Sequence, residues 1–339
     1  RVHDRRRPFG SSRRGRMLGA MTEPFDPALE ARIDDDPDDE ARFHAYAEWL
    51  AAQGSPRGEL ALVQLARAHQ DSPELAAREA ALVEAHAELL RGVHQSRYTR
   101  WLDDFCVVRW HAGFWRRIEL SGTGEQLRLV LAHRSARFVH VLHIRAIDDY
   151  SEIYDSAVTA VAEAGPRLGA LRELRIGEIP EGQDASVGFG DRTCTNLGEL
   201  APRCPSLTTL RLLCPTFDLG TQPFPRLRWL DARTGASPAS LAALARARLP
   251  RLERLDLAFD TNPKDEAMWA SLWWPDDALD GLLAAREVAM PALARLRLWP
   301  MPYEPDHPQL ERLAGAPRIE VGNWEEPAEE DDADGTYDL

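Results

Sequence analysis

The sequence is almost devoid of lysine and contains no long hydrophobic run. Lys264 is its single lysine, against 40 arginines. This bias, with alanine and proline also abundant, is typical of a GC-rich coding sequence and makes any one arginine weak support for a binding site. No apolar stretch approaches the roughly 18 residues that a membrane-spanning helix needs. The 339 residues, 44% of them hydrophobic, suffice for one large domain or two smaller ones.

Positive charge is in deficit overall, which argues against a general affinity for nucleic acids or membranes. The formal net charge is −14. The charge is unevenly placed, with seven arginines in residues 1–20 and eight acids but no base in residues 325–339. No apolar segment follows Arg13 and Arg14, so we expect no export signal and a cytoplasmic protein. Residues 1–22 are expected to be disordered or to precede the true start at Met17 or Met21, and residues 325–339 to form a disordered acidic tail.

Cysteine is scarce, and its spacing does not indicate a metal site. Three of the four cysteines, Cys194, Cys204 and Cys214, lie ten residues apart. Zinc sites usually contain a closely spaced CxxC-type pair, which is missing here. We therefore predict small buried residues in consecutive turns of a repeat, with reduced thiols and no metal.

The motifs of common enzymes are also missing. The sequence has no P-loop, GxSxG, HExxH or kinase signature. Its ten histidines are scattered along the chain. We expect a protein without catalytic residues or cofactors, and therefore not an enzyme.

Residues 23–104 are predicted to form a helical module. The acidic run of residues 34–40 suits the positively polarised start of a helix, with Pro37 in its first turn. Phe43, Tyr46, Ala47 and Leu50 then recur at helical spacing. A second helix should follow Gly54-Ser55-Pro56, and a third should span residues 73–91. The acidic run lacks the glycine and the final glutamate of an EF-hand, so a capped helix start is preferred to a calcium loop.

Residues 36–65, DPDDEARFHAYAEWLAAQGSPRGELALVQL, resemble the bacterial repeat-companion module. That module usually has an acidic D-P-D-D start, then Y-A-D-W-L, then G-D-P-R-G-E before a hydrophobic residue. Glu48 and Ser55 stand here where aspartate is usual. The resemblance implies an N-terminal module of bacterial proteins that often continue into repeats. It implies no known chemistry, so no functional residue is carried over from it.

A short pattern recurs through the rest of the chain. The motif apolar-x-x-apolar-x-apolar occurs eight times, and its best copies are ALRELRI, SLTTLRL, RLERLDL and ALARLRL. The copies begin at Trp115, Val139, Leu171, Leu207, Leu227, Leu252, Leu293 and Ala316. Their spacings of 24, 32, 36, 20, 25, 41 and 23 residues compare with roughly 20–29 for leucine-rich repeats. The longer gaps predict insertions or a degenerate repeat, for example around Leu197 and Leu200.

The pattern predicts strands that alternate with helices. Residues two apart in a strand share a face, so the fourth and sixth positions should point into a core. Apolar residues at helical spacing follow most copies, near residues 127–131, 157–162, 241–245, 279–283 and 310–313. One strand–helix unit cannot bury its apolar side alone, so neighbouring units must stack. The predicted fold is an α/β leucine-rich-repeat solenoid over residues 105–324, a horseshoe with a parallel sheet inside and helices outside, whose open end the helical module caps.

The alternative fold is a doubly wound α/β domain. Its nucleotide-binding form needs a glycine-rich GxGxxG turn after the first strand. Gly122 and Gly124 follow the first predicted strand, but the spacing fails at Leu127. The solenoid is therefore the preferred interpretation.

The third, fifth and seventh positions of each copy should face the concave side of the arc. Arginine fills nine of these 24 positions. Arginine and tryptophan are enriched among residues that dominate binding energy at interfaces. The candidate binding residues are Arg117, His143, Arg145, Arg175, Arg211, Trp229, Arg233, Arg254, Arg295, Arg297 and Trp299. Trp269, Trp273 and Trp274, in the longest gap, could form either a binding loop or a local core.

The leading functional hypothesis is a scaffold that binds an acidic protein or peptide on this concave face. Two alternatives remain open. The chain could be a structural or regulatory module that acts through its helical cap or through self-association, with no ligand on the concave face. It could also bind nucleic acid through the arginines, which the negative net charge disfavours.

Overall fold

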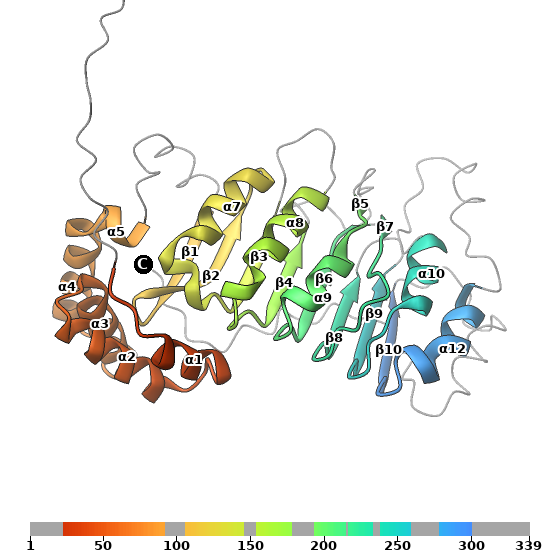
Figure 1. The fold of residues 1–339 in the computed structure, drawn as a ribbon, viewed down its shortest axis with the longest axis horizontal. Coiled ribbons are helices and arrows are strands. Elements are labelled where there is room, and N and C mark those ends of the chain that lie inside the picture. The colour runs from red at the N-terminus through yellow and green to blue at the C-terminus, as the bar shows by residue number, and fades with distance from the viewer. Residues whose placement is uncertain are drawn as a thin grey trace, which may run out of the picture.

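The protein is a mixed α/β structure, seen here in a computed structural model. The structure describes residues 23–91, 106–145, 154–177, 193–214, 216–232, 238–258 and 278–299. A group of helices precedes an eight-stranded, mostly parallel sheet (Figure 1). The order of strands in this sheet is β1-β2-β3-β4-β6-β8-β9-β10, so each new strand is added beside the one before it.

Within residues 23–91, the N-terminal module contains five helices and lies beside the β1–β2 end of the sheet (Figure 1). They are α1 (Pro27–Asp35), α2 (Glu40–Ala52), α3 (Pro56–His69), α4 (Pro73–Ala85) and α5 (Ala87–Arg91). The side chains of Asp26, Asp39 and Ser72 accept hydrogen bonds from the first backbone amides of α1, α2 and α4. Such caps satisfy N–H groups that have no partner within the helix.

Two details of this module differ from the sequence prediction. The acidic run does not begin one helix: Asp34 and Asp35 end α1, Pro37 lies between helices, and α2 starts only after its cap, Asp39. A carboxylate near a helix C-terminus is unfavourable, and here Arg137 compensates Asp34 with an Nη1–Oδ1 hydrogen bond of 2.9 Å. The predicted third helix is also divided, at His86, into α4 and α5.

Seven strands of the sheet occupy copies of the repeated pattern. They are β2 (Phe114–Leu120), β3 (Val141–Ile144), β4 (Glu173–Ile176), β6 (Thr209–Leu212), β8 (Trp229–Ala232), β9 (Arg254–Ala258) and β10 (Arg295–Trp299). They are parallel and in register, so equivalent positions of the pattern lie side by side. The strand predictions are thus confirmed for seven copies. The eighth, which begins at Ala316, lies outside the described residues, as do residues 1–22 and 325–339.

The sheet begins with a hairpin that the sequence did not predict. Strand β1 (Cys106–His111) runs antiparallel to β2, and the two are joined by the two-residue turn Ala112-Gly113. Both turn residues have positive φ, +48° for Ala112 and +79° for Gly113. Consecutive positive φ angles make a type I′ turn, whose twist matches that of a β-hairpin. The expectation of a wholly parallel sheet is therefore wrong at this edge.

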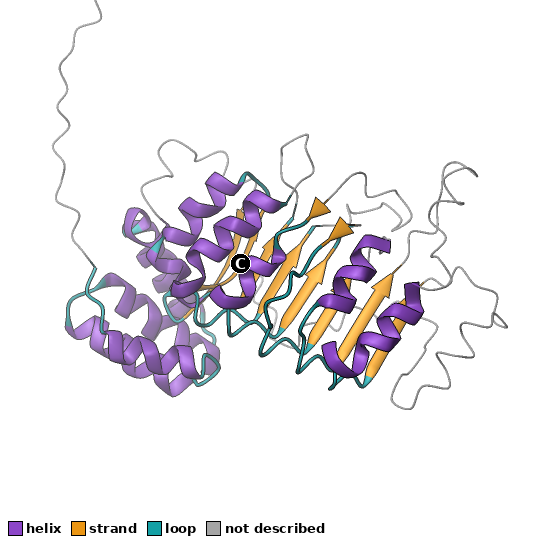
Figure 2. Cartoon of the chain, turned by 45° about the vertical axis from the view of Figure 1, so that its right-hand side comes forward, coloured by secondary structure: helices purple, strands orange, loops and turns teal. Residues whose placement is uncertain are grey.

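The other helices of the described part lie on one face of the sheet (Figure 2). They are α7 (Gly124–Ala132), α8 (Asp155–Ala164), α9 (Leu200–Arg203), α10 (Pro238–Arg246) and α12 (Ala278–Ala289). Helices α7, α8, α10 and α12 fall where apolar residues recur at helical spacing, whereas residues 310–313 are outside the described part. A 3-10 turn at Leu197–Glu199 and α9 occupy the expected degenerate unit, and a separate parallel pair, β5 (Thr193–Cys194) and β7 (Thr216–Phe217), lies nearby. Among the described residues, no helix is both long and apolar enough to span a membrane.

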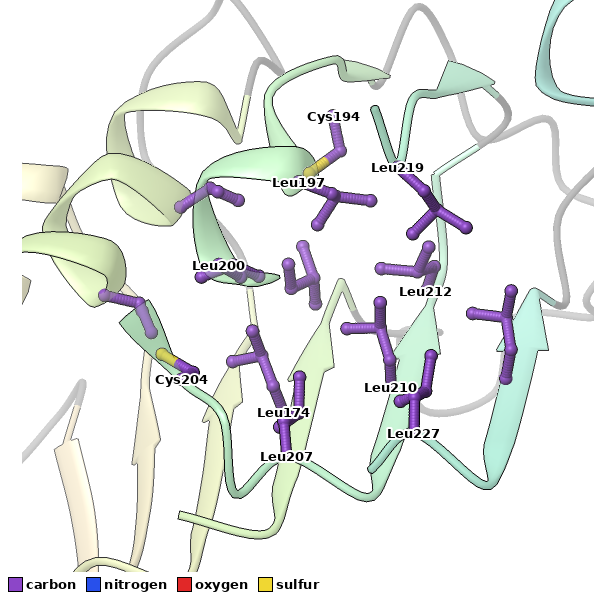
Figure 3. Packing of buried hydrophobic residues seen from close by; sticks show 14 of the residues in the cluster. Leu174, Cys194, Leu197, Leu200, Cys204, Leu207, Leu210, Leu212, Leu219 and Leu227 are labelled. Atoms are coloured by element: carbon purple, nitrogen blue, oxygen red, sulfur yellow. The ribbon is translucent and has the colours of Figure 1, made fainter. Parts of the chain in front are cut away.

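The core lies between the sheet and these helices. In β3, β4 and β6, burial alternates residue by residue, with the fourth and sixth pattern positions inside. Figure 3 shows Leu174, Leu207, Leu210 and Leu227 packed together below the helical layer, with Cys204 at its edge. The predicted burial of Cys194, Cys204 and Cys214 is confirmed, and burial raises the pKa of Cys204 to about 12. A raised pKa makes a buried thiol such as Cys204 a weaker nucleophile, which fits a packing role.

Replacing a leucine in this layer should destabilise the whole sheet. Leu210 is fully buried in β6, so Leu210→Ala leaves a cavity and should lower the free energy of unfolding by about 2–5 kcal/mol. Thr209→Ala, one residue away on the opposite face, should change it by about 0.5 kcal/mol or less. Urea denaturation followed by circular dichroism measures both. Equal effects of the two substitutions would contradict the alternation described here.

Candidate functional site

The face of the sheet opposite the helices, which we call the open face, carries the side chains predicted to bind a partner. The third pattern positions form one row across neighbouring strands, and the fifth positions form a second row, because the strands are in register. The third-position row contains Arg117, Val141, Glu173, Thr209, Trp229, Arg254 and Arg295. The fifth-position row contains Glu119, His143, Arg175, Arg211, Asp231, Asp256 and Arg297. The structure therefore brings most of the predicted residues together on one face.

Most of the arginines in these rows are already paired with acids. Within single strands, Arg117 Nε lies 2.9 Å from Glu119 Oε1, Arg175 Nε lies 2.5 Å from Glu173 Oε1, and Arg254 Nε lies 2.6 Å from Asp256 Oδ2. Between strands, Arg211 Nε lies 3.1 Å from Asp231 Oδ2.

These pairs change the electrostatic character of the predicted surface. The prediction counted arginines and left out Glu119, Glu173, Asp231 and Asp256, which pair with them. A signal for three of the pairs was present in the sequence, because opposite charges two residues apart in a strand share a face. The two rows hold six arginines and four acids, so the open face is much less basic than its arginines alone suggest.

Trp229, on the sixth strand of the sheet, lies between two guanidinium groups on the open face. The Cζ atoms of Arg211 and Arg254 are 5.3 and 4.2 Å from the centroid of its ring, within the range of cation–π attraction. Its indole Nε1 donates a hydrogen bond of 2.8 Å to Asp256 Oδ2. Asp231 and Asp256, which pair with these two arginines, are only 1% and 4% exposed. We call Arg211, Trp229, Asp231, Arg254 and Asp256 the Trp229 cluster.

Burial shifts the pKa of two groups on this face. Desolvation raises the pKa of Asp256, opposed chiefly by the positive charge of Arg254. Desolvation also lowers the pKa of His143, whose Nε2 lies 2.9 Å from the carbonyl oxygen of Gly177. A neutral imidazole with its proton on Nε2 donates this hydrogen bond. His143 therefore contributes shape and a polar contact near neutral pH, not the positive charge expected of a basic surface.

The remaining predicted residues lie on or after other strands, or outside the described part of the chain. Arg295 and Arg297 lie on β10, which contributes no acid to the two rows. Arg145 follows β3, and its carbonyl accepts a hydrogen bond of 2.9 Å from the Tyr154 hydroxyl. Arg233, the side chain of Trp299 and the tryptophans of residues 269–274 lie outside the described part. Within the described ranges, no group of three or more His, Cys, Asp or Glu side chains could hold a metal ion.

Comparison with known proteins does not assign this surface a role. No protein-family model matches the sequence, and no curated protein matches it. A structural neighbour is a Bacteroides fragilis protein whose crystal structure was determined as a structural-genomics target. The match has 16% sequence identity and a TM-score of 0.39, and it covers 50% of this chain and 46% of that protein. The chain thus matches less than half the length of this neighbour, and so distant a likeness supports no conclusion about function.

The buried position of Asp231 predicts that its charge matters for stability. Asp231→Asn keeps the shape of the side chain but weakens its hydrogen bond with Arg211, and should lower the free energy of unfolding by about 1–2 kcal/mol. The matched control is Glu163→Gln on α8, whose ion pair with Arg128 is 41–57% exposed. That substitution should cost about 0.5 kcal/mol or less, because exposed pairs contribute little. Urea denaturation compares the two variants, and an equal loss would show that burial does not strengthen the Asp231 pair.

Proposed function

We propose that this chain is a leucine-rich-repeat-type solenoid that acts without catalysis as a protein-binding scaffold in the cytoplasm. Recurrence of one strand pattern in seven parallel, in-register strands supports the repeat architecture. Within the described ranges, the helices that cover the sheet lie on one face, which favours the other face as the place for a partner (Figure 2). The N-terminal helices would be the repeat-companion-like module that their sequence resembles.

The Trp229 cluster is the observation that favours binding on the open face. Tryptophan and arginine recur among the few residues that supply most of the energy at protein interfaces. Here the indole is fixed by its hydrogen bond to Asp256, and both flanking guanidinium groups are held by ion pairs. Side chains that are already ordered lose less conformational entropy when a partner binds. The cluster is thus a preorganised contact surface across β6, β8 and β9.

The partner that fits this face is a protein or peptide with an acidic segment. The two rows hold six arginines and four acids, and two of these arginines, Arg295 and Arg297, lie on β10. Over the described strand positions, basic side chains therefore outnumber acidic ones. An acidic segment that crosses β8, β9 and β10 could contact the indole and place carboxylates near β10. Charge complementarity of this kind mainly determines orientation and association rate.

The ion pairs also favour a second candidate function. Because most open-face arginines already have acidic partners, they could serve to keep the exposed strands soluble and in register. The chain would then be a structural or regulatory module that acts through its helices or through self-association.

Substitution of Trp229, and separately of Arg295 together with Arg297, distinguishes these two functions. Bait protein of the wild type, of Trp229→Ala and of Arg295→Glu/Arg297→Glu is used to capture partners from a lysate of the native host. A captured partner is then purified and titrated calorimetrically. Open-face binding predicts at least a tenfold weaker affinity for Trp229→Ala, which corresponds to about 1.4 kcal/mol. The double variant should bind more weakly and lose most of its dependence on salt.

The matched control is Arg128→Glu, which reverses a charge on α7, on the helical face. It should leave the affinity unchanged. Equal affinity of all the variants would exclude the open face as the binding site. Capture of copies of the chain itself, or of nothing specific, would favour the structural function.

A further inference from the structure

We propose that helix α3 of the N-terminal module recognises the turn of the β1–β2 hairpin, and that Arg57 and Gln64 make this recognition. The proposal concerns docking within the chain and is independent of open-face binding. It assigns a role to Pro56-Arg57-Gly58, which belong to the repeat-companion-like motif. The resemblance to that module implies no chemistry for any of its residues.

Both backbone polar groups of Gly113 are bound by side chains of α3. Arg57 Nη1 donates a hydrogen bond of 2.6 Å to the carbonyl oxygen of Gly113. The amide of Gly113 donates one of 2.7 Å to Gln64 Oε1. Gln64 is held in this orientation because its Nε2 donates to Glu79, 2.7 Å away. Contact with the donor and the acceptor of one residue specifies how the turn is oriented, which apolar packing alone would not do.

The site accepts only a residue without a side chain. A Cβ atom on Gly113 would lie 2.8 Å from the carbonyl oxygen of Arg57 and 3.0 Å from its Cγ. The φ of +79° independently favours glycine. Ala112, the other turn residue, is 2% exposed and packs with the module residues Phe43, Tyr46 and Leu50. The turn is therefore inserted into the module, whereas most hairpin turns are exposed to solvent.

Arg57 could not be buried without the rest of its contacts. Its side chain is only 1% exposed, and an arginine in such a position requires a counter-ion and satisfied donors. Glu23 supplies the counter-ion, with Nε–Oε1 and Nη2–Oε2 distances of 2.6 and 3.0 Å. Ser135, in the turn before β3, accepts a further hydrogen bond of 2.8 Å from Nη1. The guanidinium also lies 4.9 Å from the ring centroid of Phe114, the first residue of β2.

The neighbouring motif residues place Arg57 for this contact. Pro56 is at the first turn of α3, where a missing amide costs nothing. Gly58 allows α3 to pass close to α2, because a Cβ there would lie 2.2 Å from the amide nitrogen of Ala51. Tyr46 extends the same interface: its hydroxyl donates to Glu30 at 2.7 Å, and Glu30 is paired with Arg134 and Arg137 ahead of β3.

Hydrogen–deuterium exchange of the full-length chain tests the proposal. Gly113→Ala lies outside the module, yet it should accelerate exchange of the α3 amides, residues 56–69, at least tenfold. The matched control is Gly220→Ala, which also places alanine at a positive φ, +64°, but far from the module. It should leave exchange in α3 unchanged. Equal exchange of α3 in the two variants would overturn the proposal.

A milder variant keeps the test decisive if Gly113→Ala does not fold. Gln64→Met keeps the length of the side chain but removes the acceptor for the Gly113 amide. That amide should then exchange at least tenfold faster, while exchange in β6 and β8 stays as in the wild type. Unchanged protection of the Gly113 amide would show that Gln64 does not hold the turn, and the proposal would fail.

Discussion

The structure depends on lateral burial of the apolar pattern positions in successive parallel strands. Leu174, Leu210, Leu230 and Leu255 occupy the same pattern position in β4, β6, β8 and β9, and all are fully buried. A four-residue strand with one helix cannot enclose its own leucines, so each unit is stable only against its neighbours. The register between strands is fixed as a result, since a slip of one residue would turn every leucine to the opposite face.

The open face follows from the same constraint. Once the fourth and sixth positions are inside, the residues between them form straight rows on the other side, only about 4.8 Å apart from strand to strand. Charged side chains at this spacing interact electrostatically. Arg211 therefore finds Asp231 on the next strand, and Arg254 finds Asp256 two residues along its own strand. Ion pairing of this face is a consequence of stacking the units in register, whatever the face binds.

The sequence predicts the elements whose apolar pattern lies within one short stretch of residues. It does not predict features that depend on contacts between residues far apart in the sequence. The strands and the helices between them were found because each copy carries its own apolar spacing. Strand β1 was missed because CVVRWH has no copy of the pattern, and its pairing with β2 depends on the turn at Ala112-Gly113. Pro37 was placed in a helix because the preceding α1, with its cap at Asp26, was not recognised. Contacts such as Arg211–Asp231, twenty residues apart, required the lateral register, which composition does not contain.

Arg57 in the N-terminal module is buried, whereas Arg211 and Arg254 on the open face are partly exposed, and this difference affects where a partner can bind. Arg57 contacts Glu23, Gly113 and Ser135, which lie in three separate segments of the chain. Its side chain is only 1% exposed. A ligand could reach Arg57 only by removing the module from the sheet. Arg211 and Arg254 keep 24% of their side chains exposed beside Trp229, although their Nε atoms are paired. Arg211 and Arg254 can therefore contact another molecule without unfolding, whereas Arg57 cannot. The repeat-companion-like motif, although it is the most recognisable part of the sequence, is thus a less suitable ligand site than the open face.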